Sequence, residues 1–215
     1  MRSDQSKPSS GNNDIIDAYL YPLMVPLVKR FVPPWVTPNA ITTVAFVFCL
    51  LAAGSLFFIS QPIALVLSGS FILLWNIVDS CDGIQARLTN QKSKFGAFFD
   101  PYVDIVGEFF IFMGILYYFD VRNYWYISAL MGRFAYKTAL AFYMISLTQH
   151  FVTLIGQSTA NCVLAFILLW QYFFPFQIVV GGIEISPLTL YFIVTLITLP
   201  LLFVQLLMMS YDELK

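Results

Sequence analysis

The chain has 215 residues, of which 59% are hydrophobic and only 11% are charged. A soluble domain of average composition carries about 25% charged residues, so this chain lacks the polar surface that a water-soluble protein needs. Its formal net charge of −1 provides no basic surface for nucleic acid, and a nucleic-acid partner is therefore excluded. The composition predicts a membrane protein whose solvent is partly the lipid bilayer.

The chain begins with a polar segment, residues 1–13, which is rich in Ser, Asn and Gly and which we expect to be a disordered cytoplasmic tail. The next segment, 14–31, combines an apolar face with Asp17, Lys29 and Arg30. It is too short and too polar to cross a bilayer, so it predicts an amphipathic helix that lies at the membrane interface. Residues 14–215 are expected to form a single transmembrane domain.

A helix that spans a bilayer needs about 20 mostly apolar residues. Six segments have this length and character, which predicts an all-α membrane protein with six transmembrane helices after the interfacial helix. The expected spans lie at about 38–59, 62–87, 95–119, 124–148, 157–176 and 187–210.

The basic residues predict the orientation of these spans. Of the basic residues that lie outside the fourth span, all but one fall on one side of the six-span arrangement. Only Arg122 falls on the other side, where short connections such as 177–186 are expected. Because basic loops stay inside, both termini and the loop 88–94 are predicted to be cytoplasmic. The protein is therefore expected to be an integral, multi-pass membrane protein with its active site on the cytoplasmic side.

Four carboxylates, those of Asp79, Asp82, Asp100 and Asp104, fall within 26 residues of the second and third spans. Asp79 and Asp82 are three positions apart, and Asp100 and Asp104 are four positions apart, so each pair shares one face of its helix. A short loop makes the two helices antiparallel neighbours. The four acids are therefore expected to converge near the cytoplasmic boundary.

Charges inside membrane spans are costly and mark functional sites by default. Four facing carboxylates repel one another or take up protons unless a cation neutralises them, and oxygen ligands without His or thiolate suit Mg²⁺ or Mn²⁺. Gly83 and Ala86 leave room for a ligand beside this cluster, and Arg87 is able to hold a phosphate oxygen. The competing interpretation is that the glycine serves helix packing and that the acids are solvated.

The spacing D-x2-D-G-x2-A-R-x8-G-x3-D-x3-D resembles the signature of the CDP-alcohol phosphotransferase family of integral membrane enzymes. The chain matches it at Asp79, Asp82, Gly83, Ala86, Arg87, Gly96, Asp100 and Asp104. The segment from Pro38 to Thr42 is also similar to the family's nucleotide-contacting segment. The likeness covers about residues 14–210.

The resemblance implies a Mg²⁺-dependent transferase that moves a substituted phosphate group from a CDP-linked donor to an alcohol and releases CMP. It implies that two metal ions are bound by Asp79, Asp82, Asp100 and Asp104, and that Asp104 is also the general base. It implies that the nucleotide and its diphosphate are bound by Asn39, Thr42, Asp79, Gly83, Ala86, Arg87 and Gly96. Family members commonly dimerise, so a homodimer is expected.

The donor and the acceptor are less clearly indicated. The short chain favours CDP-diacylglycerol as the donor and a small polar alcohol as the acceptor. Asp100-Pro101 resembles the glycerophosphate-using branch of the family, but Ile105 and Ala45 stand where that branch usually has basic residues. The alternative is a choline/ethanolamine-type enzyme that uses CDP-choline or CDP-ethanolamine with diacylglycerol, because the segment from Pro38 to Thr42 resembles those enzymes.

Arg133 and Lys137 lie one turn apart in the fourth span, and Glu108 lies one turn beyond Asp104 in the third. One interpretation is a cationic pocket for an acceptor that bears a phosphate or carboxylate. The other is a buried ion pair or triad that joins the two helices.

Two other functions remain to be separated from this one. A membrane prenyltransferase also uses aspartates and Mg²⁺, but its two acidic motifs lie far apart in sequence. A non-enzymatic cation transporter also places carboxylates within spans, but usually shows internal repeats and broken helices. Binding of a cytidine nucleotide with divalent metal would exclude the transporter.

Overall fold

The computed structural model describes residues 15–122, 124–147, 157–175, 178–180 and 183–213. These residues form seven helices and one short hairpin. In chain order the elements are α1 (Ile15–Phe31), α2 (Pro38–Phe58), α3 (Ile63–Leu88), α4 (Lys94–Tyr118), α5 (Tyr124–Leu147), α6 (Gln157–Phe173), β1 (Ile178–Val180), β2 (Ile183–Ile185) and α7 (Pro187–Glu213).

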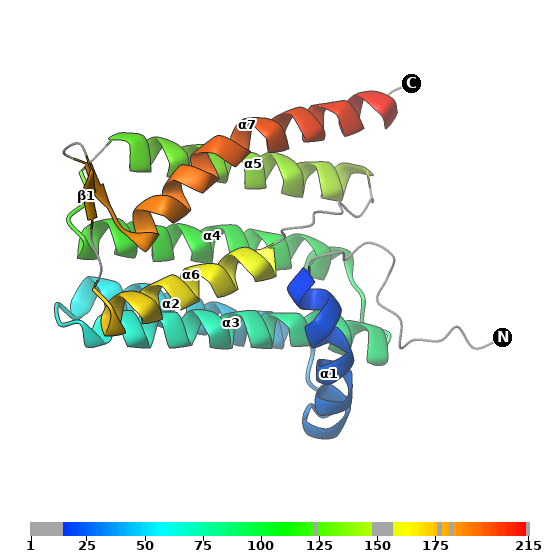
Figure 1. The fold of residues 1–215 in the computed structure, drawn as a ribbon. Coiled ribbons are helices and arrows are strands. Elements are labelled where there is room, and N and C mark those ends of the chain that lie inside the picture. Colours follow the sequence, from blue (N-terminus) through cyan, green and yellow to red (C-terminus); the bar gives the residue numbers. More distant parts are fainter. Residues whose placement is uncertain (1–14, 123, 148–156, 176–177, 181–182, 214–215) are drawn as a thin grey trace.

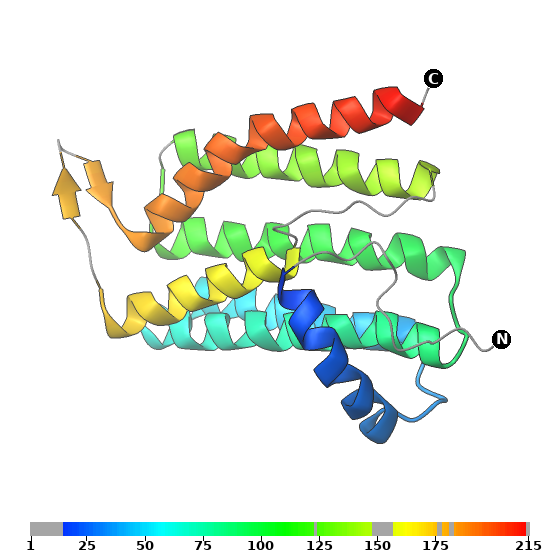
Figure 2. The same ribbon diagram turned by 45° about the vertical axis from the view of Figure 1, so that its right-hand side comes forward.

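Successive long helices run in opposite directions and form an up-and-down bundle, and α1 crosses one end of it (Figure 1). Helix α2 packs against both α3 and α4, α3 also packs against α6, and α5 pairs with α7. Figure 2 shows the β1–β2 hairpin at the end of the bundle opposite to the connection between α3 and α4, and shows that α6 begins partway along the bundle. One end of the bundle therefore gathers α1, the start of α2, the end of α3 and the start of α4.

Local sequence signals determine where these helices begin and end. Thr37 precedes α2 and its hydroxyl accepts the N–H of Ala40, while Ser93 precedes α4 and its hydroxyl accepts the N–H of Gly96 at 2.9 Å. Such side chains satisfy backbone donors that a helix leaves unpaired at its start. Helix α3 ends before Asn90, whose φ of 55° lies in the left-handed region that Asn tolerates.

Small residues allow the central helices to approach one another closely. A Cβ atom at Gly69 would lie 2.9 Å from Leu169 Cγ and 3.0 Å from the carbonyl oxygen of Ala165, so α3 and α6 pack backbone to backbone there. A Cβ atom at Gly114 would lie 3.2 Å from the carbonyl oxygen of Ala53 on α2. These glycines serve helix packing, which is a common use of small residues between membrane helices.

Three helical segments of the described chain are long and apolar enough to cross a membrane, and they are Pro38–Phe58, Ile63–Leu88 and Pro187–Val204. Large apolar side chains also face outward along the bundle, including Phe58 at 89% and Leu201 at 69% exposure. Outward apolar side chains suit lipid rather than water as the surrounding solvent. The chain is thus a helical membrane protein.

The segment 177–186, expected to be only a connecting loop, contains the one departure from an all-helical architecture within the described residues. β1 and β2 pair antiparallel, with Ile178 opposite Ile185 and Val180 opposite Ile183. The sequence contains a signal for this hairpin, because two short segments that contain β-branched residues, 178–180 and 183–185, flank Gly181-Gly182. The all-α expectation is therefore correct for the bundle and overlooks this hairpin.

Candidate active site

Three carboxylates from two helices meet where α3 ends and α4 begins. Asp79 and Asp82 on α3 and Asp100 on α4 each offer an oxygen atom, and these atoms lie within 4.8 Å of one another. The short loop predicted that α3 and α4 are direct neighbours, but within the described chain they do not pack on each other. Both pack against α2, and this brings the pair on α3 to the acid on α4. Three oxygen ligands this close have the donor type and spacing that a hard divalent cation requires.

Asp104 lies one turn further along α4, outside this group of three. Its side chain lies near those of Lys137 and Gln157. Within the described part of the chain, Asp104 Oδ1 and Asp100 Oδ1 are buried and accept no hydrogen bond. Because an unsatisfied buried carboxylate oxygen is costly, these atoms fit the ligand set of a bound cation. By chemistry all four acids suit Mg²⁺ or Mn²⁺, and by arrangement Asp79, Asp82 and Asp100 do so.

The start of α2 adjoins the cluster. The Thr42 hydroxyl donates a hydrogen bond to Asp82 Oδ2, and both residues are buried, at 3% and 8% exposure. Asn39 lies against Gly96 at the start of α4, because a Cβ atom there would lie 3.0 Å from Asn39 Oδ1. A larger residue at position 96 would displace Asn39. The structure thus brings the segment from Pro38 to Thr42 to the acidic motif.

Gly83 differs from the packing glycines described above. The nearest atom that an added Cβ would meet is Arg87 Nη2 at 3.5 Å, which is an ordinary van der Waals distance. No neighbouring helix within the described chain approaches this position closely enough to require glycine. Ala86 lies on the same helix and is half-buried. Their nucleotide-binding role stays a prediction, but helix packing does not account for Gly83.

Gln85 is a part of this site that sequence reasoning missed. Its side chain is 2% exposed, and its Nε2 donates to the carbonyl oxygens of Pro33 and Val36 at 3.0 and 3.1 Å. The chain between α1 and α2 is thereby attached to the helical turn that carries the motif. The available signal was an uncharged polar side chain within an expected membrane span, where a polar group needs a partner.

Glu108 forms a buried ion triad with Arg133 and Lys137. Arg133 Nε and Nη2 lie 2.8 and 2.7 Å from Glu108 Oε1, and Lys137 Nζ pairs with Glu108 Oε2. Lys137 Nζ also donates to Gln157 Oε1 at 3.0 Å. The ion-triad interpretation thus describes the contacts that these side chains make. Lys137 is the member of the triad that lies near Asp104.

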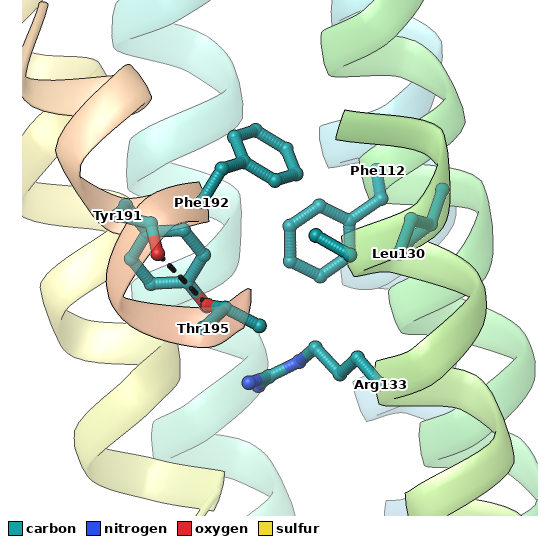
Figure 3. A pocket seen from close by; sticks show the side chains of 7 residues that line it. Phe112, Leu130, Arg133, Tyr191, Phe192 and Thr195 are labelled. Carbon is teal, nitrogen blue, oxygen red and sulfur yellow. Dashed lines mark hydrogen bonds between the residues drawn. The ribbon is translucent and has the colours of Figure 1, made fainter. Parts of the chain in front are cut away.

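The side of Arg133 that faces α7 is closely filled. Figure 3 shows Arg133 extending from α5 toward Tyr191 and Thr195 on α7, next to Phe112 on α4. Thr195 Oγ1 donates to the carbonyl oxygen of Tyr191 at 2.8 Å, and the Arg133 guanidinium carbon lies 5.7 Å from the centre of the Phe112 ring. The pocket that these residues line leaves no room for a bound molecule.

Comparison with known proteins agrees with the geometry of the site. The family model of the CDP-alcohol phosphatidyltransferases matches residues 35–210, which include the motif and both helices that carry it, and the chain belongs to this family. The resemblance inferred from the motif is thereby confirmed.

Curated relatives match over shorter stretches. The chain is 32% identical to cholinephosphotransferase 1 of Gallus gallus over 53% of its own length and 36% of that relative. It is 31% identical to archaetidylinositol phosphate synthase of Pyrococcus horikoshii, over 58% of its own length and 59% of the relative. It is 34% identical to choline/ethanolaminephosphotransferase 2 of Arabidopsis thaliana, over 40% and 24%. The chain thus spans between about a quarter and three fifths of the length of these relatives.

Proposed function

We propose that the protein is a phospholipid-synthesising transferase. It moves a phosphatidyl group from a CDP-linked donor, CDP-diacylglycerol, to the hydroxyl of a small polar alcohol and releases CMP. The observation that carries this proposal is the meeting of Asp79, Asp82 and Asp100 within 4.8 Å, in a chain that belongs to the CDP-alcohol phosphatidyltransferases.

The four aspartates would hold two Mg²⁺ ions, with Mn²⁺ as the alternative metal. Bound there, the ions would polarise the diphosphate and offset the charge that develops as the phosphorus–oxygen bond to CMP breaks. Asp82 is oriented for this role by Thr42, and Asp100 and Asp104 each contribute a buried oxygen that otherwise has no donor among the described residues.

Asp104 is the general base in this proposal. It would take the proton from the acceptor hydroxyl as that oxygen bonds to the phosphorus distal to cytidine, and the oxygen bridging the two phosphates would leave with CMP. Arg87 would hold the diphosphate, while Asn39, Thr42, Gly83, Ala86 and Gly96 would line the nucleotide site. Gly83 supports this assignment because no neighbouring helix requires glycine there.

In the proposed acceptor site, Lys137 is the residue that contacts the acceptor. Lys137 lies near Asp104, so a phosphate or carboxylate held by its ammonium group would place an acceptor hydroxyl beside the base. Arg133 and Glu108 would then act by holding Lys137 in position, because Glu108 contacts both cations. The filled pocket on the α7 side of Arg133 favours approach from the Asp104 side.

The proposed topology has six transmembrane helices and an interfacial α1. Helices α4 and α5 have 25 and 24 residues, enough to span the hydrocarbon, and apart from Lys94 at the start of α4 their charged residues belong to the acidic motif and the ion triad. Helix α6 has 17 residues, or about 26 Å at 1.5 Å per residue. Basic residues at the α3–α4 end favour a cytoplasmic active site.

A homodimer is part of the same proposal, and the mass of the purified protein–detergent complex would test it.

The decisive experiment incubates the purified protein with labelled CDP-diacylglycerol, Mg²⁺ and single acceptors, including glycerol 3-phosphate, inositol phosphate and serine. We expect CMP release and a labelled lipid with one acceptor, and loss of both on chelation of the metal. Asp82→Asn serves as the inactive variant, and Asp120→Asn, at an exposed position, serves as its matched control.

A choline/ethanolamine-type reaction is the second candidate, because two of the relatives above carry those names. CDP-choline and CDP-ethanolamine with diacylglycerol therefore belong in the same panel. Transfer from these donors alone would replace the first candidate. If no donor released CMP and vesicles containing the protein conducted Mg²⁺ instead, the cation transporter would replace both.

A further inference from the structure

Tyr21 on α1 lies over the guanidinium group of Arg87. The Arg87 Cζ atom is 4.9 Å from the centre of the Tyr21 ring. At this distance the face of an aromatic ring attracts a cation. Arg87 belongs to the acidic motif, whereas Tyr21 lies outside it, in the helix expected at the interface.

The packing of α1 on α3 brings this contact about. Met24 and Val28, three and seven residues after Tyr21, share its helical face and are buried against Ile84. Ile84 precedes Arg87 by three residues, so both project from neighbouring positions of α3. An apolar contact of α1 with Ile84 thereby places an aromatic ring over the adjacent arginine.

Arg87 is positioned on its other side by its own helix. Its Nη2 atom lies 3.5 Å from the position that a Cβ would take on Gly83, so the side chain runs back along α3 toward the aspartates. Its Nε atom is buried and, among the described residues, has no hydrogen-bond partner. The guanidinium is thus oriented by the Tyr21 ring and by the surface of α3, and its Nε–H group is available to donate a hydrogen bond to a ligand.

We propose that Tyr21 is a positioning residue for the phosphate-binding arginine: its ring holds the Arg87 guanidinium over Gly83, ready to bind the diphosphate of the CDP-linked donor. This inference rests on the proposed function for the identity of the ligand. The gain is preorganisation, because an arginine that is already ordered loses less side-chain entropy when the donor binds.

The test compares three single variants with the wild-type protein in detergent. Tyr21→Leu removes the ring, and Tyr21→Phe retains it without the hydroxyl. Phe31→Leu is the matched control. Phe31 also contacts an arginine through its ring, since the Arg30 Cζ atom lies 5.5 Å from the ring centre, but Phe31 is 68% exposed and lies outside the contact with Arg87. Donor KM, kcat and the Kd for CMP in the presence of Mg²⁺ are measured for each protein, together with the melting temperature.

For Tyr21→Leu we expect donor KM and the Kd for CMP-Mg²⁺ to rise about 2- to 30-fold with kcat unchanged, which is the range that a cation–π contact corresponds to. Tyr21→Phe should keep wild-type values, and so should Phe31→Leu. Wild-type affinity in a folded Tyr21→Leu protein would overturn the inference, and so would tighter binding, which would mean that the ring competes with the donor for Arg87.

Two further results keep the interpretation unambiguous. If Tyr21→Leu melts earlier than Tyr21→Phe, donor affinity is measured below the melting temperature of both variants. Loss of affinity in Tyr21→Phe as well would overturn the inference, because that variant retains the ring over Arg87. If the wild-type protein transfers no phosphatidyl group and binds no CMP, the proposed function fails together with this inference. Wild-type transfer with an unaffected Tyr21→Leu variant refutes only the inference.

Discussion

Thr42 donates a hydrogen bond to Asp82 although 40 residues separate them. The two residues come from the first turn of α2 and the last turns of α3, and the bond is buried. A hydrogen bond of this kind orients one carboxylate lone pair and leaves the remaining ones for other ligands. The segment from Pro38 to Thr42 and the acidic motif are therefore parts of one polar site.

Thr42→Val should weaken metal binding. Valine has the same shape but no hydroxyl, so Asp82 loses its orienting donor, and partners of this kind typically change metal affinity about 10- to 100-fold. The measurement is the Mg²⁺ concentration that gives half-maximal transfer. Thr43→Val is the matched control, since the Thr43 hydroxyl donates only to the carbonyl oxygen of Asn39 on an exposed face. An equal effect of both variants would contradict the prediction.

Asp104→Asn should abolish transfer and leave the fold intact. Asparagine keeps the volume of the side chain but cannot accept the acceptor's proton, so kcat should fall at least about 100-fold. Single-turnover assays and circular dichroism would check activity and folding. Turnover of the purified variant at the wild-type rate would show that another group is the base.

Lys137→Met should raise the acceptor KM at unchanged expression. Methionine retains the length of the lysine stem but removes the cation near Asp104. The donor KM, measured in parallel, should not change. Loss of folded protein as the sole effect would instead favour a purely structural ion triad.

Glu108→Gln should destabilise the fold more strongly than any exposed ion-pair change. It leaves Arg133 and Lys137 buried without their counter-charge, and breaking a buried pair in this way costs about 3–5 kcal/mol. Unfolding in detergent measures the cost, with Arg122→Gln at an exposed pair as control. The double variant Glu108→Gln/Lys137→Gln should be more stable than Glu108→Gln alone; if it is less stable, the unpaired cation is not the cause.

Gly83→Ala should fold normally and still impair nucleotide binding. The added methyl group would make only ordinary contact with Arg87, whereas Gly69→Ala would meet Leu169 and the backbone of Ala165 and should cost about 1–3 kcal/mol. Comparing melting temperatures and CMP affinity of the two variants separates packing from ligand approach. A normal CMP affinity of the Gly83→Ala variant would contradict a role of Gly83 in nucleotide binding.

The sequence predicted the features that depend on residues close together in the chain. Apolar segments of about 20 residues predicted a bundle of long helices, and the spacing of the aspartates predicted that acids on α3 and α4 would meet, as Asp79, Asp82 and Asp100 do. The number of spans and the role of each site residue stay predictions.

Contacts that depend on the crossing of helices could not be predicted. That Gln85 would bond to the chain between α1 and α2, or that Tyr21 would lie on Arg87, depends on how α1 packs against α3. The contacts of Glu108 could not be predicted either. Whether Arg133 and Lys137 form an open cationic pocket or an ion triad with Glu108 depends on the distance between α4 and α5.

The attachment of Gln85 to Pro33 and Val36 means that the chain between α1 and α2 is not a passive spacer. Lengthening it by even one residue would shift these carbonyl groups off their donor and move the start of α2 relative to the aspartates of the acidic motif. Tolerance to insertion should therefore be low here and higher in the connection before Tyr124, where the charged side chains are exposed.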